Sequence, residues 1–215
     1  MAKILSLHFK LPRMKIICIG RNYIDHAKEL NNPVPKSPLI FMKPSTALLK
    51  DGKPFYHPDF SKNIHYELEV VLKICKNGKA IPEKYAKDYF EEIGLGIDLT
   101  ARDIQDICKE KGNPWELAKA FDHSAVLGSF VNKKKIESEE IKFKLLKNGL
   151  VVQNGNTKDL IFKFEYLISY ISKYFTLQKG DLIFTGTPAG VGKINIEDHY
   201  EGWIENTKYL DCRIK

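Results

Sequence analysis

The sequence predicts an α+β fold in which short helices flank a curved, mixed β-sheet. Strand-like runs outnumber helical segments along its 215 residues, and the two kinds do not alternate strictly, as they would in a doubly wound fold. Neither an internal repeat nor a low-complexity linker divides the chain, and its length suits one domain with its own core. We therefore expect a single domain over residues 1–215, with residues 1–13 as a candidate leader before the first clear strand.

The predicted strands are runs of aliphatic, β-branched and aromatic residues bounded by turn-forming residues. In chain order they cover residues 15–20, 38–43, 66–75, 93–100, 124–131, 141–147, 150–153, 181–186 and 209–214. The clearest local signal is Asn148-Gly149, which separates two of these runs. A type I′ turn needs positive φ at both central residues, and Asn-Gly meets that need. The sequence therefore predicts a β-hairpin around this dipeptide.

The predicted helices have apolar residues at helical spacing. They cover residues 82–92, 101–111 and 164–175. The last has an apolar stripe at Leu167, Ile168, Ile171 and Phe175, which predicts that this face is buried. In the segment GRNYIDHAKEL, residues 20–30, a glycine turn precedes what we expect to be a short helix.

The composition is that of a globular protein, with 43% hydrophobic and 28% charged residues. A formal charge of +7 raises nucleic-acid binding as a hypothesis, but the basic residues are scattered and no stretch interleaves them with aromatic residues. No run approaches the ~18 apolar residues that span a bilayer. The sequence therefore predicts neither a nucleic-acid partner nor a membrane partner.

The N-terminal segment and the cysteines predict a cytoplasmic protein. The first apolar run is short, is interrupted by His8 and Lys10, and precedes no small-residue cleavage site. The cysteines are isolated and lack zinc-type spacing, so we expect buried thiols in a reducing compartment. They are Cys18, Cys75, Cys108 and Cys212.

The segment HYELEV, residues 65–70, places Glu67 and Glu69 on one face if the backbone is extended. Two glutamates on a solvated strand face would need no explanation. The strand continues as VVLKIC, however, and this nearly continuous apolar run indicates burial on both faces. Paired buried carboxylates repel each other and lose hydration, so a bound metal ion would resolve the conflict.

Asp98 is a third carboxylate candidate, at the point where a predicted strand gives way to a helix. Three carboxylates without a set of thiols or imidazoles favour a hard divalent cation, namely Mg²⁺ or Mn²⁺, with Ca²⁺ as an alternative. His65 has the same strand parity as the two glutamates. It is either a fourth ligand or, as hard cations prefer oxygen, a neighbour of the ligands or a structural histidine.

His26 and Glu29 lie three residues apart on the predicted short helix and therefore on one face. A carboxylate that fixes the tautomer of a histidine and raises its basicity prepares the imidazole to take a proton from water. The alternative for such a pair on a helix surface is a simple ion pair. The sequence pattern alone leaves both interpretations open.

Five segments carry a more specific signal: IGRNYIDHAKE, IFMKPSTALL, HYELEVVL, GIDLTARDIQDICKEKGNPWELAKAFD and GDLIFTGTPAGVG. Through these segments the chain resembles the fumarylacetoacetate hydrolase family, and within it the acylpyruvase and oxaloacetate decarboxylase branch. The resemblance implies a homodimer whose fold is built on a rolled mixed sheet of the family's catalytic-domain type. It also implies Mg²⁺- or Mn²⁺-dependent attack on carbon–carbon bonds beside the 2-oxo group of a small acid.

The resemblance also assigns expected roles to residues. It implies a metal triad of Glu67, Glu69 and Asp98, and a water-activating pair of His26 and Glu29 on a lid that orders when substrate binds. The further pocket positions that match are catalytic Lys119 and Gln105 and substrate-binding Arg102, Thr187 and Lys43. Simpler interpretations stay open, because Arg102 could pair with Asp106 along its helix and Lys119 could be a solvated lysine.

The residue types suit this chemistry. A metal that chelates the 2-oxo and carboxylate oxygens of a pyruvate moiety stabilises, as a Lewis acid, the enolate left when the bond breaks. Lys119 and Gln105 would hold the remote carbonyl and the attacking water, and Thr187 would donate to the substrate carboxylate.

Three functions compete at this point. The first is hydrolysis of acylpyruvates such as acetylpyruvate or fumarylpyruvate to pyruvate and a carboxylate, with oxaloacetate decarboxylation as a further activity. The second keeps the fold and metal but makes the chain an isomerase or hydratase of 2-oxo dienoic acids in aromatic catabolism. The presence of both His26 and Glu29 favours the first. The third, a nucleic-acid-binding module, is disfavoured by the scattered charge and by three acidic residues in the expected pocket.

Overall fold

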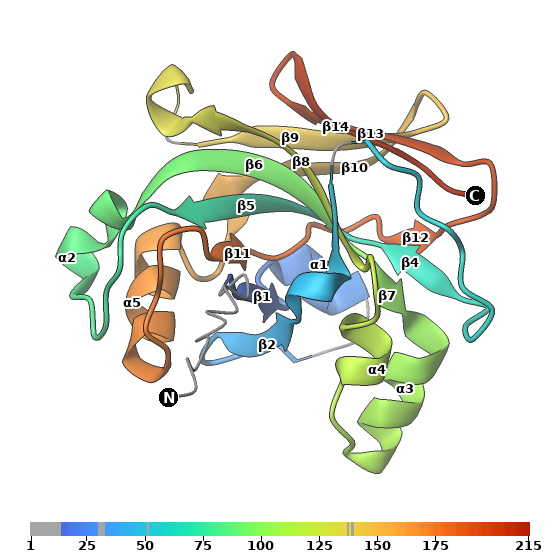
Figure 1. Cartoon of the computed structure of the whole chain (residues 1–215), viewed down its shortest axis with the longest axis horizontal. Helices are drawn as coiled ribbons and strands as arrows, with labels where there is room; N and C mark the ends of the chain where they lie inside the picture. Colours follow the sequence, from blue (N-terminus) through green and yellow to red (C-terminus); the bar gives the residue numbers. More distant parts are fainter. Residues whose placement is uncertain (1–13, 30–32, 51, 137, 139) are drawn as a thin grey trace, which may run out of the picture.

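The computed structural model describes residues 14–29, 33–50, 52–136, 138 and 140–215, and it has a mixed α+β architecture with curled sheets (Figure 1). The predicted leader, residues 1–13, lies outside the described residues. The largest sheet has seven strands in the order β2-β1-β11-β5-β6-β8-β3. Its strands are β1 (Ile16–Gly20), β2 (Leu39–Lys43), β3 (Leu48–Leu49), β5 (Leu68–Ile74), β6 (Phe90–Asp98), β8 (Ala125–Asn132) and β11 (Leu182–Phe184).

Two smaller sheets complete the β-structure. A four-stranded sheet, in the order β10-β9-β13-β14, lies above β5 and β6 in Figure 1. It comprises β9 (Lys142–Lys147), β10 (Leu150–Asn156), β13 (His199–Ile204) and β14 (Thr207–Arg213). The three-stranded sheet comprises β12 (Gly192–Lys193), β4 (Ile64–Tyr66) and β7 (Thr100–Ala101). Strand β1 pairs with β11, and β3 with β8, in parallel, whereas the other ladders are antiparallel, so the predicted mixed sheet is confirmed.

The helices are short and lie around the sheets (Figure 1). They are α1 (Ile24–Glu29), α2 (Glu83–Ala86), α3 (Arg102–Lys111), α4 (Glu116–Lys119) and α5 (Phe164–Tyr174). The stripe predicted for the last helix is buried at Leu167, Ile168 and Ile171, whereas Phe175 follows the helix end and is partly buried. No helix in the described part of the chain is long and apolar enough to cross a membrane.

The core lies where the four-stranded sheet packs on the long strands of the seven-stranded sheet. Phe143 and Tyr200 face it from one side, and Leu68 and Leu95 from the other. Gly202 of β13 permits the close approach, because a Cβ there would lie 3.2 Å from Leu95 and 3.4 Å from Leu68. This packing fixes the strand ends that carry the candidate site.

Most predicted elements are confirmed, including the hairpin turn, where φ is 52° at Asn148 and 82° at Gly149. The predicted helix over 82–92 is largely wrong. It ends at Ala86, a 3-10 turn follows at Lys87–Tyr89, and β6 begins at Phe90. The residues from Phe90 onward form a strand despite their helical spacing, because β6 is hydrogen-bonded to β5 on one side and to β8 on the other.

Two further differences concern strands. The predicted strand over 66–75 is broken at Glu67, because β4 belongs to the three-stranded sheet and β5 to the seven-stranded one. Strand β13 was not predicted, since HYEGWI carries a glycine and two polar residues. Its alternation of half-buried and buried side chains is nevertheless a strand pattern.

All four cysteines are free, and Cys18, Cys108 and Cys212 are buried as predicted, whereas Cys75 is partly exposed.

Candidate functional site

Three buried carboxylates meet at the ends of central strands. Glu67 lies between β4 and β5, Glu69 lies on β5, and Asp98 is the last residue of β6. Each offers an oxygen, and these oxygens lie within 4.8 Å of one another. The backbone enforces the arrangement, since Glu69 pairs with Gly96 across the ladder and the Asp98 amide donates to the Glu67 carbonyl at 2.9 Å. The structure therefore brings together Glu67, Glu69 and Asp98, the three carboxylates that we expected to lie close together.

Two of the three carboxylates are paired with buried cations. Glu67 accepts from Arg102 Nη2 at 2.5 Å and from Lys119 Nζ at 2.8 Å. Lys119 Nζ also lies 2.8 Å from Asp98 Oδ2, and Lys43 Nζ lies 2.7 Å from Asp98 Oδ1. Burial alone would raise the pKa of Glu67, but the charges of Lys119 and Arg102 outweigh it and hold this pKa well below its usual range.

Glu69 is the carboxylate without a counter-charge. Among the described residues no basic side chain lies within ion-pair distance of it, and its Oε2 accepts one hydrogen bond, from the Gly186 amide at 2.7 Å. Burial, and then the negative charges of Asp98 and Glu67, raise its pKa well above the ordinary value. A buried, unpaired carboxylate facing two others is costly for the protein alone and suits a bound cation.

The donor set fits a hard divalent metal. Only carboxylate oxygens converge here, and oxygen donors are those that Mg²⁺, Mn²⁺ and Ca²⁺ prefer. His65 is not one of the converging groups, because its Nε2 contacts Asn63 Oδ1 at 3.1 Å. Burial and the positive charge of Arg102 lower the pKa of His65. Its position agrees with a structural histidine rather than with a fourth ligand.

The predicted histidine–carboxylate pair is formed on α1. His26 Nδ1 lies 3.2 Å from Glu29 Oε2, and the His26 side chain is almost fully buried. Glu29 is held from its other side, because its Oε1 accepts from the Gly190 amide at 3.0 Å. Pairing at Nδ1 leaves Nε2 as the ring nitrogen available for proton transfer.

Helix α3 supplies Arg102 and Gln105, which are both buried. Arg102 Nη1 donates to Gln105 Oε1 at 2.6 Å, so Arg102 contacts Glu67 and Gln105. The alternative pair with Asp106 is not formed, because Asp106 lies beside Lys109 at 3.9 Å. Arg102 Nε has no hydrogen-bond partner, which leaves donor capacity at the site.

Lys119 and Lys43 are not solvated lysines, because both are buried. Lys119 Nζ bridges Glu67 and Asp98 and also contacts Thr100 Oγ1 at 2.5 Å. Lys43 Nζ lies behind Asp98, where it donates to Ser124 Oγ at 3.0 Å and to the Lys119 carbonyl. These contacts surround Lys43 with protein groups and make it a support for Asp98. The expected role of Lys43 in binding substrate stays a prediction, and the burial of Lys43 among protein groups does not favour that role.

The carboxylates line a cavity of about 40 Å³, here termed the inner cavity. The predicted residues on its wall are His26, Glu67, Glu69, Asp98, Arg102, Gln105, Lys119 and Thr187. Wall residues that were not predicted are Ile19, Gly20, Arg21, Leu39, Phe41, Lys109 and Trp115. Neither Lys43 nor His65 is on the wall.

Sequence reasoning also missed Gln153, which supports Thr187 from β10. Gln153 Nε2 donates to Thr187 Oγ1 at 2.9 Å and to the Pro188 carbonyl at 3.0 Å, while its Oε1 accepts from the Leu68 amide at 2.9 Å. The ladder shifts register between Val151 and Gln153. The run LVVQ carries no signal for this irregularity, which determines where the glutamine side chain points.

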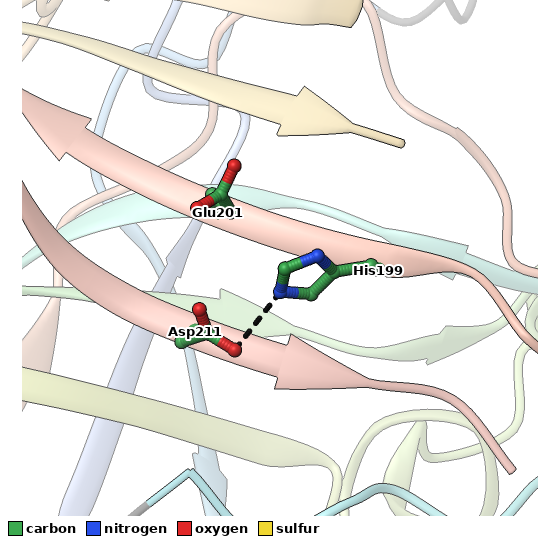
Figure 2. A group of neighbouring side chains, drawn as sticks. All are labelled: His199, Glu201 and Asp211. Carbon is green, nitrogen blue, oxygen red and sulfur yellow. Dashed lines mark hydrogen bonds and ion pairs between the residues drawn. The ribbon is translucent and has the colours of Figure 1, made fainter. Parts of the chain in front are cut away.

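A second group of potential ligands lies on β13 and β14, where His199, Glu201 and Asp211 come together (Figure 2). His199 Nε2 lies 2.9 Å from Asp211 Oδ1. Lys208 Nζ forms ion pairs with both acids, at 2.8 Å from Glu201 and 2.9 Å from Asp211, and these two contacts raise the pKa of Lys208 to about 12. The group is partly exposed and does not line the inner cavity, which is the candidate site.

Several known proteins are similar to this chain over most of its length. The human mitochondrial oxaloacetate tautomerase FAHD1 is 45% identical over 201 residues, which are 93% of this chain and 91% of that protein. The structure of fumarylpyruvate hydrolase from Pseudomonas aeruginosa, in complex with Mn²⁺ and pyruvate, is 34% identical with a TM-score of 0.88, over 93% of this chain and 88% of that one. A 5-carboxymethyl-2-hydroxymuconate delta-isomerase from Mycobacterium smegmatis is 30% identical with a TM-score of 0.81, over 93% of this chain and 78% of that one.

The model of one protein family, described as fumarylacetoacetate (FAA) hydrolase C-terminal, matches residues 15–215. This match covers nearly the whole chain and includes every residue assigned to the candidate site. The chain therefore belongs to the fumarylacetoacetate hydrolase family and is an enzyme of the hydrolase and isomerase type that this family comprises.

Proposed function

We propose that this chain is a divalent-metal-dependent enzyme that cleaves the carbon–carbon bond of an acylpyruvate with water, giving pyruvate and a carboxylate. The observation that carries the proposal is Glu69, a buried carboxylate with no basic side chain beside it in the described structure, held against Glu67 and Asp98. The Mn²⁺ and pyruvate in the fumarylpyruvate hydrolase structure agree with such a site.

The side chains around the carboxylates have the roles that this reaction needs. When bound, a divalent cation acts as a Lewis acid toward the 2-oxo oxygen of the substrate. His26 takes a proton from water at Nε2 while Glu29, 3.2 Å from Nδ1, fixes the tautomer. Arg102, with its unpaired Nε, and Lys119 supply positive charge beside the oxygens that become negative.

The bonds balance without a further reactant. The oxygen of the activated water adds to the acyl carbonyl carbon, and the bond between that carbon and the methylene carbon of the pyruvate part breaks. The electron pair passes to the pyruvate part as its enolate, which takes up a proton. The products are the carboxylate of the acyl group and pyruvate.

A second candidate is interconversion of the keto and enol forms of oxaloacetate. It is favoured by the human relative, whose name is oxaloacetate tautomerase and which is 45% identical over 93% of this chain. Both reactions pass through the enolate of a 2-oxo acid, so one site could serve either. Decarboxylation of oxaloacetate, expected from the sequence, forms the same kind of enolate. The isomerase alternative is supported by the delta-isomerase structure.

One panel of substrates separates these candidates. Purified protein is assayed with Mn²⁺ or Mg²⁺ on acetylpyruvate, fumarylpyruvate and oxaloacetate, with pyruvate release, CO₂ release and enol absorbance measured separately. We expect metal-dependent pyruvate release from the acylpyruvates. Enol–keto conversion of oxaloacetate without hydrolysis of any acylpyruvate would favour the tautomerase, and full activity in excess EDTA would overturn the metal assignment.

Thr187 gives a prediction about substrate binding. Replacing it by alanine should lower kcat/KM by about 10-fold, mainly through KM, because one hydroxyl donor to the substrate carboxylate is lost. Thr187→Ser keeps the hydroxyl and is the matched control. Steady-state kinetics on the best substrate measures the effect, and wild-type kinetics for Thr187→Ala on every 2-oxo acid would remove Thr187 from the binding residues.

The sequence-based expectations of a cytoplasmic location and a homodimer stay predictions. The human relative is named as a mitochondrial protein, so location is open to direct measurement. Light scattering of the purified protein would test the dimer.

A further inference from the structure

A second hollow of about 280 Å³, here termed the outer groove, adjoins the inner cavity. Residues 39–42 of β2, residues 113–116 and Lys119 line it. The two hollows share Leu39, Phe41, Trp115 and Lys119 on their walls. The outer groove therefore lies directly beside the candidate site, and the same four side chains line both hollows.

Two aromatic rings form the common wall. The rings of Phe41 and Trp115 meet edge to face, with centroids 6.1 Å apart. Lys119 Nζ lies 5.1 Å from the centroid of the Phe41 ring, and the same ammonium group contacts Glu67 and Asp98 at 2.8 Å. A group that displaced or stacked on Phe41 would thus lie next to the proposed reaction centre.

The inner cavity is too small for a whole substrate. Its volume of about 40 Å³ suits a few water-sized groups, whereas ligand pockets commonly measure about 300–1,000 Å³. Only together do the two hollows reach the lower end of that range. An acylpyruvate with its pyruvate end at the carboxylates needs space for its other end, and the outer groove offers that space.

We propose that the outer groove receives the acyl arm of the substrate and selects arms that are uncharged and apolar. This inference rests on the proposed acylpyruvate hydrolysis and adds the class of acyl group. It concerns only the atoms of the acyl group beyond the bond that is cleaved, so it predicts nothing about the rate with a four-carbon acid such as oxaloacetate.

The chemistry of the groove supports an apolar arm. Most of its described lining is apolar, from residues 39–42, Pro114 and Trp115. Its single basic residue within that lining, Lys119, already contacts Glu67, Asp98 and Thr100. Its single acidic residue there is Glu116, which repels an anion. An arm with a carboxylate would lose hydration without gaining a free counter-charge.

The test is a series of acylpyruvates whose acyl groups are acetyl, butanoyl, benzoyl and fumaryl, assayed with Mn²⁺. We expect kcat/KM for butanoyl and benzoyl to exceed that for acetyl by about 10-fold or more, the scale of added apolar contact in a pocket. The fumaryl compound, whose arm carries a carboxylate, should be the poorest.

Two variants on exposed positions test the groove itself. Glu116→Lys should raise the ratio of kcat/KM for the fumaryl compound to kcat/KM for the acetyl compound by about 10-fold, because it supplies a free cation. Asn113→Trp should narrow the groove and reduce the benzoyl rate more than the acetyl rate. Glu83→Lys, the same charge change on exposed α2 and outside the groove, is the control and should leave the order of substrates unchanged.

The outcomes separate the two proposals. No turnover of any acylpyruvate would overturn both the hydrolase and the groove assignment. Normal acetylpyruvate turnover, with an arm preference that Glu116→Lys and Asn113→Trp leave unchanged, would overturn the groove assignment alone. The groove assignment would also be wrong if these variants altered only the oligomeric state measured by light scattering, since the groove would then be a contact between copies of the chain.

Discussion

Replacing Glu69 by glutamine should abolish metal-dependent turnover without destabilising the metal-free protein. The substitution removes one of three anionic donors and keeps the side-chain shape, so the kinetic loss should reach about 10³-fold or more, given that Lewis-acid stabilisation is worth several kcal/mol. The glutamine oxygen can still accept from the Gly186 amide, which Glu69 Oε2 now does at 2.7 Å.

The stability change has the opposite sign from that of an ordinary core substitution. Burial and the charges of Asp98 and Glu67 raise the pKa of Glu69, which means that its charged form is unfavourable in the metal-free protein. Glutamine removes that charge, so the melting temperature without metal should stay the same or rise. Each kcal/mol relieved corresponds to about 2–4 °C for a chain of this size.

Thermal melts with and without Mn²⁺ provide the measurement. At about 100 times its dissociation constant, Mn²⁺ should stabilise the wild type by about 2.7 kcal/mol, or roughly 5–10 °C, and this shift should vanish in Glu69→Gln. Glu201→Gln is the matched control, because Glu201 belongs to the other three-residue group and is already paired with Lys208. A Mn²⁺ shift that survives Glu69→Gln and disappears in Glu201→Gln would place the metal on β13 and β14 instead.

The strands and the metal triad could be predicted because their signals are local. Glu67 and Glu69 are two residues apart, so alternation alone indicates that they point the same way, and the apolar run after them indicates burial. The break at Glu67 is not local in origin, because it arises where the chain passes from one sheet to another. The two glutamates still converge, since both flank Leu68, which begins the ladder with β6.

Side-chain surroundings set by distant segments could not be predicted. A match to a family position indicates that Lys43 belongs near the site, but its burial behind Asp98 depends on Ser124 and the Lys119 carbonyl, about 80 residues away in sequence. Gln153 reaches Thr187 because of a register shift in the β9–β10 ladder, and the local sequence of β10 does not predict that shift. The contact of Phe41 with Trp115 likewise joins two segments by tertiary packing alone.

Replacing His26 by alanine should separate hydrolysis from decarboxylation. Hydrolysis of an acylpyruvate needs an activated water, so its kcat should fall by about 10²–10⁴-fold, the usual scale for loss of a general base. Decarboxylation of oxaloacetate consumes no water and would depend on the electron withdrawal that a divalent cation held by Glu67, Glu69 and Asp98 would supply, so its rate should fall much less. Mn²⁺ affinity should change little, because His26 is on α1 and the triad is on β5, on β6 and in the link between β4 and β5.

Glu29→Gln should show the same split in weaker form. Glu29 contacts Nδ1 of His26 at 3.2 Å, and the amide loses the charge that favours the basic tautomer while it can still accept from the Gly190 amide. Asp25→Asn, on the same helix and with its side chain 85% exposed, is the matched control and should leave both rates unchanged. Equal loss of both activities in His26→Ala, with Mn²⁺ affinity intact, would mean that α1 positions the substrate, and His26 would then be a binding residue rather than the base.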